Sequence, residues 1–155
     1  MIYNIWKLIH IISVIIFLGN ITIGIFWKIQ ADKSTDRLKI ADTFKNIILA
    51  DRIFTMPSVA VLFIFGMGAA MQGNLSLVET PWILWGIIML IISAFAFMSK
   101  VVPIQKQILA LASDEQRFSW DEYLKLSRKW NIWGSIATIT PYIAVALMVL
   151  KPGAM

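Results

Sequence analysis

The residue most able to carry chemistry in this chain is its single histidine, His10. It lies in the stretch WKLIHIISVIIFLGN, residues 6–20, which is otherwise rich in isoleucine, valine and phenylalanine. Helical steps of three and four place five residues on one face: His10, Ser13, Phe17, Asn20 and Gly24. Polar and small residues of a membrane helix turn toward neighbouring helices. We therefore expect His10 to point into a helical bundle.

Three roles fit an inward-facing imidazole. It can form a hydrogen bond to a neighbouring helix, ligate the iron of haem b, or relay protons. Imidazole is the usual haem ligand and four-helix bundles commonly hold haem, so His10 is the candidate axial ligand and the candidate metal ligand. One histidine cannot occupy both axial positions. Met67 and Met71 are candidate second ligands, and His10 of another copy is the alternative.

No arrangement typical of an enzyme active site is recognisable in the sequence. We find no phosphate-binding loop, no paired carboxylates in an apolar segment and no nucleophile beside a base, so no catalytic residue is assigned. The chain has no cysteine, which excludes disulfides, iron–sulfur clusters and thiolate zinc sites. Asp51 and Arg52 are interpreted as an exposed ion pair or as charges that set topology. Lys100 is predicted to reach from its helix to the interface.

Several small or polar residues are interpreted as packing features. Gly24 and four further glycines are predicted to be points of close helix contact: Gly66, Gly68, Gly86 and Gly134. Pro57 and Pro141 are predicted to bend their helices. Three residues beside Pro141 are candidates to line a polar cavity, but we expect them instead to satisfy the backbone groups that Pro141 frees: Thr138, Thr140 and Tyr142.

The elements that would position these residues are long apolar segments. Of the 155 residues, 59% are hydrophobic, and the mean hydropathy is +0.75, which is high for a soluble domain. Four segments reach the spanning length of about 20 residues: 5–27, 53–71, 81–101 and 132–150. Because a lone segment in lipid must satisfy its own backbone hydrogen bonds, each is predicted to be a helix. We expect an all-α, polytopic membrane protein, with residues 1–155 forming a single four-helix transmembrane domain.

The linkers between these segments differ in charge. Residues 28–52 and 100–129 each carry six Lys or Arg, whereas residues 72–80 carry none. Five apolar residues of the first linker follow helical spacing: Leu38, Ala41, Phe44, Ile47 and Ile48. This spacing predicts an amphipathic helix on the membrane surface. The sequence SWDE at 119–122 is a capping box that predicts the start of another helix.

The distribution of basic residues predicts the orientation in the membrane. Cytoplasmic loops carry the excess of Lys and Arg, so both basic linkers are expected in the cytoplasm and both termini outside. Tryptophans near the ends of the predicted spans support their limits. The net charge of +5 is therefore attributed to topology and anionic lipid, not to nucleic acid.

Nearly the whole chain resembles a family of bacterial four-helix membrane proteins of unknown function. The resemblance is carried by the first helix and by four further segments: DRIFTMPSVAVLFIFGMG (51–68), VVPIQKQILALA (101–112), KWNIWG (129–134) and LMVLKP (147–152). In plan this family is similar to CopD-like copper-resistance proteins and to the oxygen-independent protoporphyrinogen oxidase HemJ. Lys7 and His10 match the K-x-x-H-like start of HemJ. The resemblance implies a location in a bacterial inner membrane and a membrane haem or redox metal at His10, without implying oxidase activity or copper transport.

Two functions follow as predictions. The first is electron transfer or redox support through haem b held by His10, with a second copy of the chain or a membrane redox partner. The alternative is a membrane protein without a cofactor that acts as a scaffold or as a subunit of a transporter complex. The presence or absence of a Soret band in the purified protein separates the two.

Overall fold

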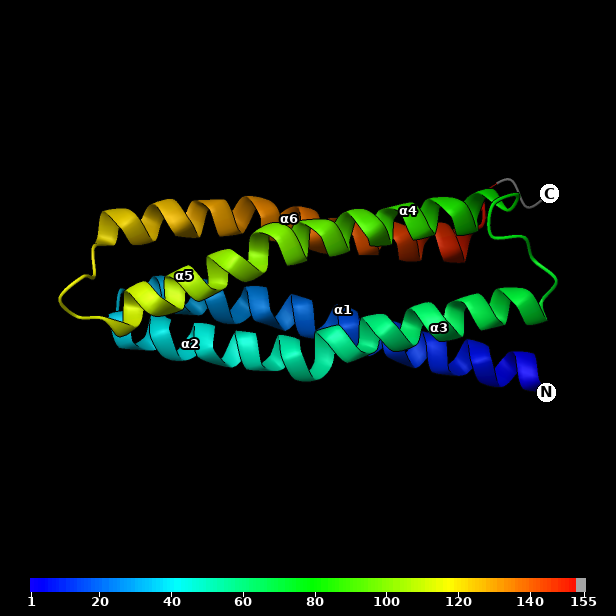
Figure 1. The fold of residues 1–155 in the computed structure, drawn as a ribbon, viewed down its shortest axis with the longest axis horizontal. Helices are drawn as coiled ribbons and strands as arrows, with labels where there is room; N and C mark the ends of the chain where they lie inside the picture. Colours follow the sequence, from blue (N-terminus) through cyan, green and yellow to red (C-terminus); the bar gives the residue numbers. More distant parts are fainter. Residues whose placement is uncertain (153–155) are drawn as a thin grey trace.

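The computed structural model describes residues 1–152, which form helices joined by short turns and contain no strand. The helical elements in chain order are α1 (Ile2–Ser34), α2 (Arg37–Ala50), η1 (Asp51–Thr55), α3 (Met56–Gln72), α4 (Pro81–Ala96), η2 (Phe97–Val101), α5 (Val102–Ser113) and α6 (Trp120–Leu150). Because η1 and η2 join their neighbours without a break, the chain forms four long rods lying side by side (Figure 1). Each rod is long and apolar enough to cross a membrane. The predicted all-α, four-helix membrane fold is confirmed.

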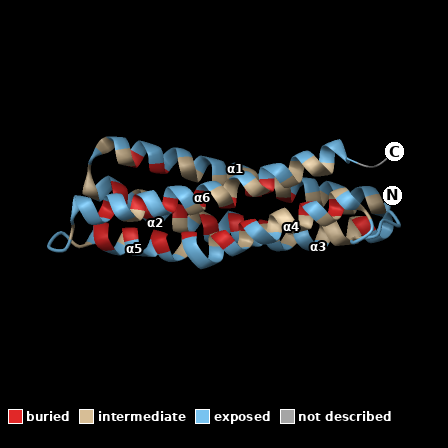
Figure 2. Ribbon diagram, turned by 90° about the horizontal axis from the view of Figure 1, so that it is seen from above, coloured by how far each residue is buried: buried red, intermediate tan, exposed pale blue. Residues whose placement is uncertain are grey.

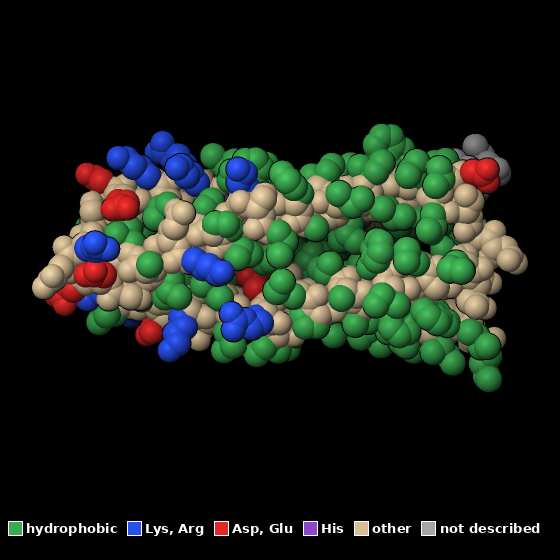
Figure 3. Space-filling view, in the orientation of Figure 1, with side chains coloured by type: hydrophobic (Ala, Val, Ile, Leu, Met, Phe, Trp, Pro, Cys, Tyr) green, Lys and Arg blue, Asp and Glu red, His purple; other side chains and the backbone are tan. Residues whose placement is uncertain are grey.

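The four rods extend well beyond the predicted apolar spans. The 33 residues of α1 would measure about 50 Å, against roughly 30 Å for the hydrocarbon core of a bilayer. The extra length lies at the end where α1 meets α2 and where α5 meets α6, at the left of Figure 1. Most Lys and Arg side chains in Figure 3 gather there, so we call it the basic end. Met1, the C-terminal end of α6 and the turn before α4 lie at the opposite, apolar end.

The helix predicted in the first linker exists, but its predicted place on the membrane surface is wrong. Ile40, Phe44 and Ile47 of α2 are buried, and α2 packs against α5 and α1 inside the bundle. Leu38, which was expected on the apolar face, is 61% exposed. The helix starts at an Asp36 cap, whose side chain accepts hydrogen bonds from two backbone N–H groups of the first turn. The first linker therefore forms a helix that packs within the bundle and lengthens it at the basic end.

The two ends of the bundle are packed differently. At the basic end, α1, α2, α5 and α6 surround a common core, and buried residues are densest there in Figure 2. At the apolar end, α1 packs on α3 and α4 packs on α6, whereas no Cα atom of α3 lies within 8 Å of a Cα atom of α4 in the described residues. The apolar half thus consists of two helix pairs with a hollow between them, visible in Figure 3.

Two π-helical turns interrupt the central rods, and each one precedes a proline. In η1 the Met56 N–H bonds to the Asp51 carbonyl, and in η2 the Val102 N–H bonds to the Phe97 carbonyl. Pro57 and Pro103 follow directly. A proline ring clashes with the carbonyl four residues earlier, and a widened turn relieves that clash. Pro57 therefore accounts for the π turn that carries Asp51.

Pro141 leaves a backbone carbonyl free, and a neighbouring helix satisfies it. Because proline has no N–H, the carbonyl of Ala137 lacks its usual partner within α6. The hydroxyl of Ser93 on α4 donates to that carbonyl at 2.6 Å. The prediction that Thr138, Thr140 and Tyr142 satisfy this carbonyl is therefore wrong, whereas Thr138 does line a cavity, which was the alternative. Thr140 bonds to the Ile136 carbonyl, and Tyr142 bonds to Thr22.

The glycines divide between tight contacts and open space. A side chain on Gly66, Gly68 or Gly86 would collide with His10, Trp6 or Met148 respectively, so close packing there is confirmed. Gly134 is in ordinary contact with Trp130. The prediction for Gly24 is wrong, because an added Cβ would meet nothing within 4 Å.

At the start of α6, Ser119 is the N-cap residue as predicted, although its side chain makes no capping hydrogen bond.

Candidate functional site

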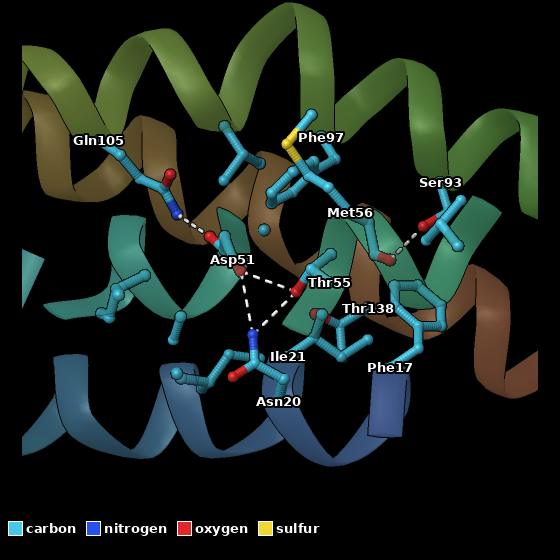
Figure 4. Close-up of a pocket in the computed structure, with 18 of the residues that line it drawn as sticks. Phe17, Asn20, Ile21, Asp51, Thr55, Met56, Ser93, Phe97, Gln105 and Thr138 are labelled. Carbon is cyan, nitrogen blue, oxygen red and sulfur yellow. Dashed lines mark hydrogen bonds between the residues drawn. The ribbon is translucent and has the colours of Figure 1, made fainter. Parts of the chain in front are cut away.

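Asp51 is the centre of a buried polar cluster at the middle of the bundle. Its side chain projects from η1 and is 9% exposed. Thr55 and Asn20 donate hydrogen bonds to Oδ1 at 2.9 and 3.2 Å, and Gln105 Nε2 donates to Oδ2 at 3.0 Å. Asn20 also donates to the Thr55 hydroxyl at 2.8 Å. The cluster joins α1, η1 and α5 around one carboxylate (Figure 4).

This carboxylate has no cationic partner in the described residues. No nitrogen of Lys, Arg or His lies within 4.0 Å of it among residues 1–152. A carboxylate offers about four acceptor positions, and the three hydrogen bonds leave one position on Oδ2. The prediction that Asp51 forms an exposed ion pair with Arg52 is wrong. The π turn directs Asp51 into the bundle, where neutral donors surround it.

A cavity of about 150 Å³ adjoins the cluster. Asn20, Asp51, Thr55 and Gln105 line one part of it, and most of the remaining wall is apolar. Phe17 and Phe97 approach it from α1 and η2, and Gly24 leaves space on the α1 side. The cavity therefore combines one acidic group with walls suited to an apolar molecule.

A second polar cluster lies nearer the basic end and is centred on Lys28. This side chain is 1% exposed. Its ammonium group donates to Asp32 Oδ2 at 2.6 Å, to Ser127 Oγ at 2.7 Å and to Asn131 Oδ1 at 2.7 Å. Tyr123 donates to the other oxygen of Asp32. The ammonium has three N–H donors and all three are used, so this cluster is electrically neutral and saturated.

Trp130 lies between the two clusters. Its indole ring lines the cavity of Asp51 and also the hollow beside Lys28. The Lys28 ammonium lies 5.6 Å from the ring centroid, within cation–π range. The indole N–H is buried and has no acceptor among residues 1–152. Buried polar groups are usually paired, so this unpaired donor is an exception.

The structure places His10 at a tight contact between α1 and α3. Its Nδ1 is 2.7 Å from the carbonyl oxygen of Leu62, and the acceptor is a carbonyl, so Nδ1 carries the hydrogen. A Cβ on Gly66 would lie 2.8 Å from the same nitrogen. The predicted interhelical hydrogen bond is present. His10 is not among the residues that line the Asp51 cavity.

The two methionines proposed as further haem ligands do not join the cavity either. Met71 is 72% exposed, and Met67 is partly buried on α3. Within residues 1–152, no group of three or more His, Cys, Asp or Glu side chains could hold a metal ion. The Nδ1 contact leaves Nε2 as the nitrogen that could bind iron, an arrangement common for metal-bound histidines. Apart from this nitrogen, residues 1–152 show no metal or haem site, and His10 lines neither of the two cavities.

Sequence reasoning identified part of the site only. Asn20 was correctly placed on the inward face of α1, together with Ser13 and Phe17, which are both buried. Asp51 was assigned to the surface because it ends the apolar span. The signal that could have corrected this is Pro57, which is six residues later and produces the π turn. Gln105 and Lys28 gave no signal, because both lie in segments interpreted as linkers.

The fold and the distribution of charge define a polytopic integral membrane protein. Four apolar rods, a basic end and an apolar end with two separate helix pairs are its defining features. The chain belongs to the family described as "Predicted integral membrane protein (DUF2269)", which residues 4–152 match. No curated protein and no solved structure matches the chain. The similarity to CopD-like proteins and HemJ stays a prediction.

Proposed function

We propose that this membrane protein takes up and releases a proton at Asp51, as part of a proton-linked transporter. The observation that carries the proposal is a buried carboxylate with three neutral donors, no cationic partner in residues 1–152 and a cavity beside it. Ionisable groups inside membrane helices commonly mark proton or ion pathways, because an unpaired charge there is costly to maintain. This role corresponds to the transporter-subunit alternative from the sequence.

The cluster can accept the proton without losing hydrogen bonds. The open acceptor position is on Oδ2, beside the Gln105 amide. When Oδ2 is protonated, rotation of the Gln105 amide replaces its N–H with its carbonyl oxygen, which accepts from the new O–H. Asn20 and Thr55 continue to donate to Oδ1. The two states of the cluster therefore differ by one proton and one amide rotation.

Infrared difference spectroscopy of the protein in lipid nanodiscs tests this proposal. Acidification should produce the C=O band of a protonated carboxyl group in an apolar environment. The band should be missing in Asp51→Asn and present in Asp42→Asn, which changes an exposed carboxylate on the same rod. Identical difference spectra for the wild type and Asp51→Asn would contradict the proposal.

The second candidate function is haem-linked electron transfer at His10. It is favoured by the bond from Nδ1 to the Leu62 carbonyl, which fixes the ring and leaves Nε2 as the ligand atom. Haem b would supply the redox chemistry, and His10 would hold the iron from α1. The second axial ligand would come from Met67, Met71 or another copy. A Soret band in protein from haem-replete cells that disappears in His10→Ala supports this function, and a colourless wild type contradicts it.

We also propose that the basic end faces the cytoplasm of a bacterial inner membrane, with both termini outside. This rests on the six Lys or Arg in each basic linker and on their absence between residues 72 and 80. Because the chain has no cysteine, single cysteines at Ser34 and Asn74 report on opposite ends. An impermeant thiol reagent added to intact cells should label Asn74→Cys alone.

A further inference from the structure

We propose that the cavity beside Asp51 binds a small amphipathic ammonium ion, with its charged head on the carboxylate and an apolar ring or short chain in the cavity. The inference rests on the proposed function, since it names the kind of molecule that exchanges with the proton. Three observations support it: the size of the cavity, its charge and its opening between the two helix pairs.

The size of the cavity sets the size of the ligand. A cavity of about 150 Å³ enclosed by apolar side chains is large enough for one benzene-sized molecule. The apolar wall here includes Phe17, Leu90 and Phe97. Gly24 adds open space on the α1 side, because a Cβ there would meet nothing within 4 Å. The apolar part of the ligand is therefore about one aromatic ring.

The charge of the cavity sets the chemistry of the head group. Asp51 has neutral donors and no cation within 4.0 Å in residues 1–152, so a cationic ligand supplies the missing charge. The open acceptor position on Oδ2 can receive one N–H of an ammonium group. The faces of Phe97 and Trp130, which also line the cavity, attract cations. An anionic or acceptor-rich head would be repelled by the same carboxylate.

The opening of the cavity explains how an amphipathic molecule reaches it. No Cα atom of α3 lies within 8 Å of a Cα atom of α4 in the described chain, so in a bilayer the hollow between the helix pairs would open toward lipid. Figure 3 shows this hollow with an acidic side chain visible at its charged end. A molecule with an apolar ring partitions into the bilayer and can enter from the side. Its head then meets Asp51 where the apolar half joins the basic end.

Binding of the ammonium ion and binding of the proton exclude each other. The protonated carboxyl group has no charge to pair with the ligand and uses its Oδ2 for the new O–H. When R–NH₃⁺ binds, that proton leaves, and the carboxylate accepts a hydrogen bond from the ammonium group. One proton is released for each ligand bound to the protonated form, which is the stoichiometry of an exchange.

The test uses 2-phenylethylammonium as the probe and 2-phenylethanol as its uncharged analogue. Calorimetric titration of the full chain in nanodiscs should show one site that prefers the ammonium ion at least tenfold. Asp51→Asn should weaken ammonium binding at least tenfold and remove the preference over the alcohol. Asp42→Asn, which removes an exposed carboxylate, should bind as the wild type does.

A matched pair of glycine variants tests the place of binding. Gly24→Leu fills the cavity and should abolish binding of both probes, whereas Gly19→Leu adds the same side chain on an exposed face of α1. Thermal unfolding followed by tryptophan fluorescence shows whether both variants fold. Equal probe affinity in folded Gly24→Leu and Gly19→Leu would overturn the inference, as would equal affinity of the wild type for the two probes.

Titrations in buffers of different protonation enthalpy separate this inference from the proton proposal. If ammonium binding releases no proton at any pH and the infrared spectrum shows no carboxyl band of Asp51, the ligand site is supported and the proton role is rejected. If a carboxyl band is assigned to Asp51 but the protein does not prefer the ammonium probe, the proton role is supported and the ligand proposal is rejected. Proton release that rises as the pH falls, together with the tenfold preference, supports both.

Discussion

The two buried charged side chains Lys28 and Asp51 have opposite surroundings, since one has a partner of opposite charge and the other does not. Lys28 is paired with Asp32, and all of its N–H groups are used by oxygens of α1 and α6. Asp51 receives three hydrogen bonds from neutral groups and has no cation beside it in residues 1–152. The first cluster adjoins the compact core of the basic end, and the second lies at a cavity.

This difference separates a structural cluster from one able to bind a ligand. Removing one partner of a saturated, buried ion pair leaves a charge that no other group can compensate. A carboxylate held by neutral donors can gain a proton or a cation while its surroundings remain in place. Substitutions in the two clusters should therefore have very different effects on folding.

Among substitutions of the charged residues in the two clusters, the largest loss of stability is expected for Asp32→Asn. Lys28 is 1% exposed, and without Asp32 its charge would have only neutral partners. Breaking a buried pair in this way typically costs about 3–5 kcal/mol. Because the Asp32 side chain is 33% exposed, we expect a loss near the lower value. Thermal unfolding of the purified protein measures it. Asp42→Asn, on the exposed face of α2, is the control and should unfold as the wild type does.

A double variant checks the origin of that loss. If the unpaired ammonium is responsible, Lys28→Met added to Asp32→Asn should recover part of the lost stability, because no charge then remains buried. Additive losses in the double variant would mean that Asp32 acts mainly through its hydrogen bond from Tyr123. In that case the contrast between the two clusters would not rest on charge pairing.

A much smaller change is expected for Asp51→Asn. The asparagine oxygen can still accept from Thr55 and Asn20, and no cation loses its partner. A neutral hydrogen bond contributes about 0.5–1.5 kcal/mol, so the free energy of unfolding should change by about 1 kcal/mol or less. A loss as large as that of Asp32→Asn would show that Asp51 is as structural as Lys28, and the comparison would fail.

The sequence predicted the membrane spans better than the site, for physical reasons. Long apolar runs must be helical in lipid, and the number of helices follows directly. The inward face of α1 followed from spacing alone, as buried Ser13 and Phe17 confirm. Asp51, Lys28 and Gln105 lie at or beyond the ends of those runs. Whether such residues face solvent or core depends on helices that continue past the apolar runs, which hydropathy does not report.

Local rules also failed where packing between helices decides the outcome. Gly24 and Gly66 both lie on apolar spans, yet Gly24 faces a cavity whereas Gly66 packs directly against the His10 ring. The carbonyl freed by Pro141 is satisfied by Ser93 of another helix and not by its own neighbours. The partner is separated by 44 residues, so sequence spacing contains no indication of it.

The smallest effect is expected for Trp130→Phe, which tests the boundary between the two clusters. The substitution removes the indole N–H that has no acceptor in residues 1–152, and an unpaired buried donor costs about 1–3 kcal/mol. It also reduces the ring that packs edge-on against Phe44 and lies under Lys28, which lowers stability by a similar amount. The two changes oppose each other, so the midpoint of thermal unfolding should move little. The control is Trp130→Ala, which removes the ring as well and should cost about 3–5 kcal/mol.

A large loss in Trp130→Phe, close to that of Trp130→Ala, would mean that the indole N–H has a partner such as a bound water. The region around Trp130, between the two clusters, would then be hydrated.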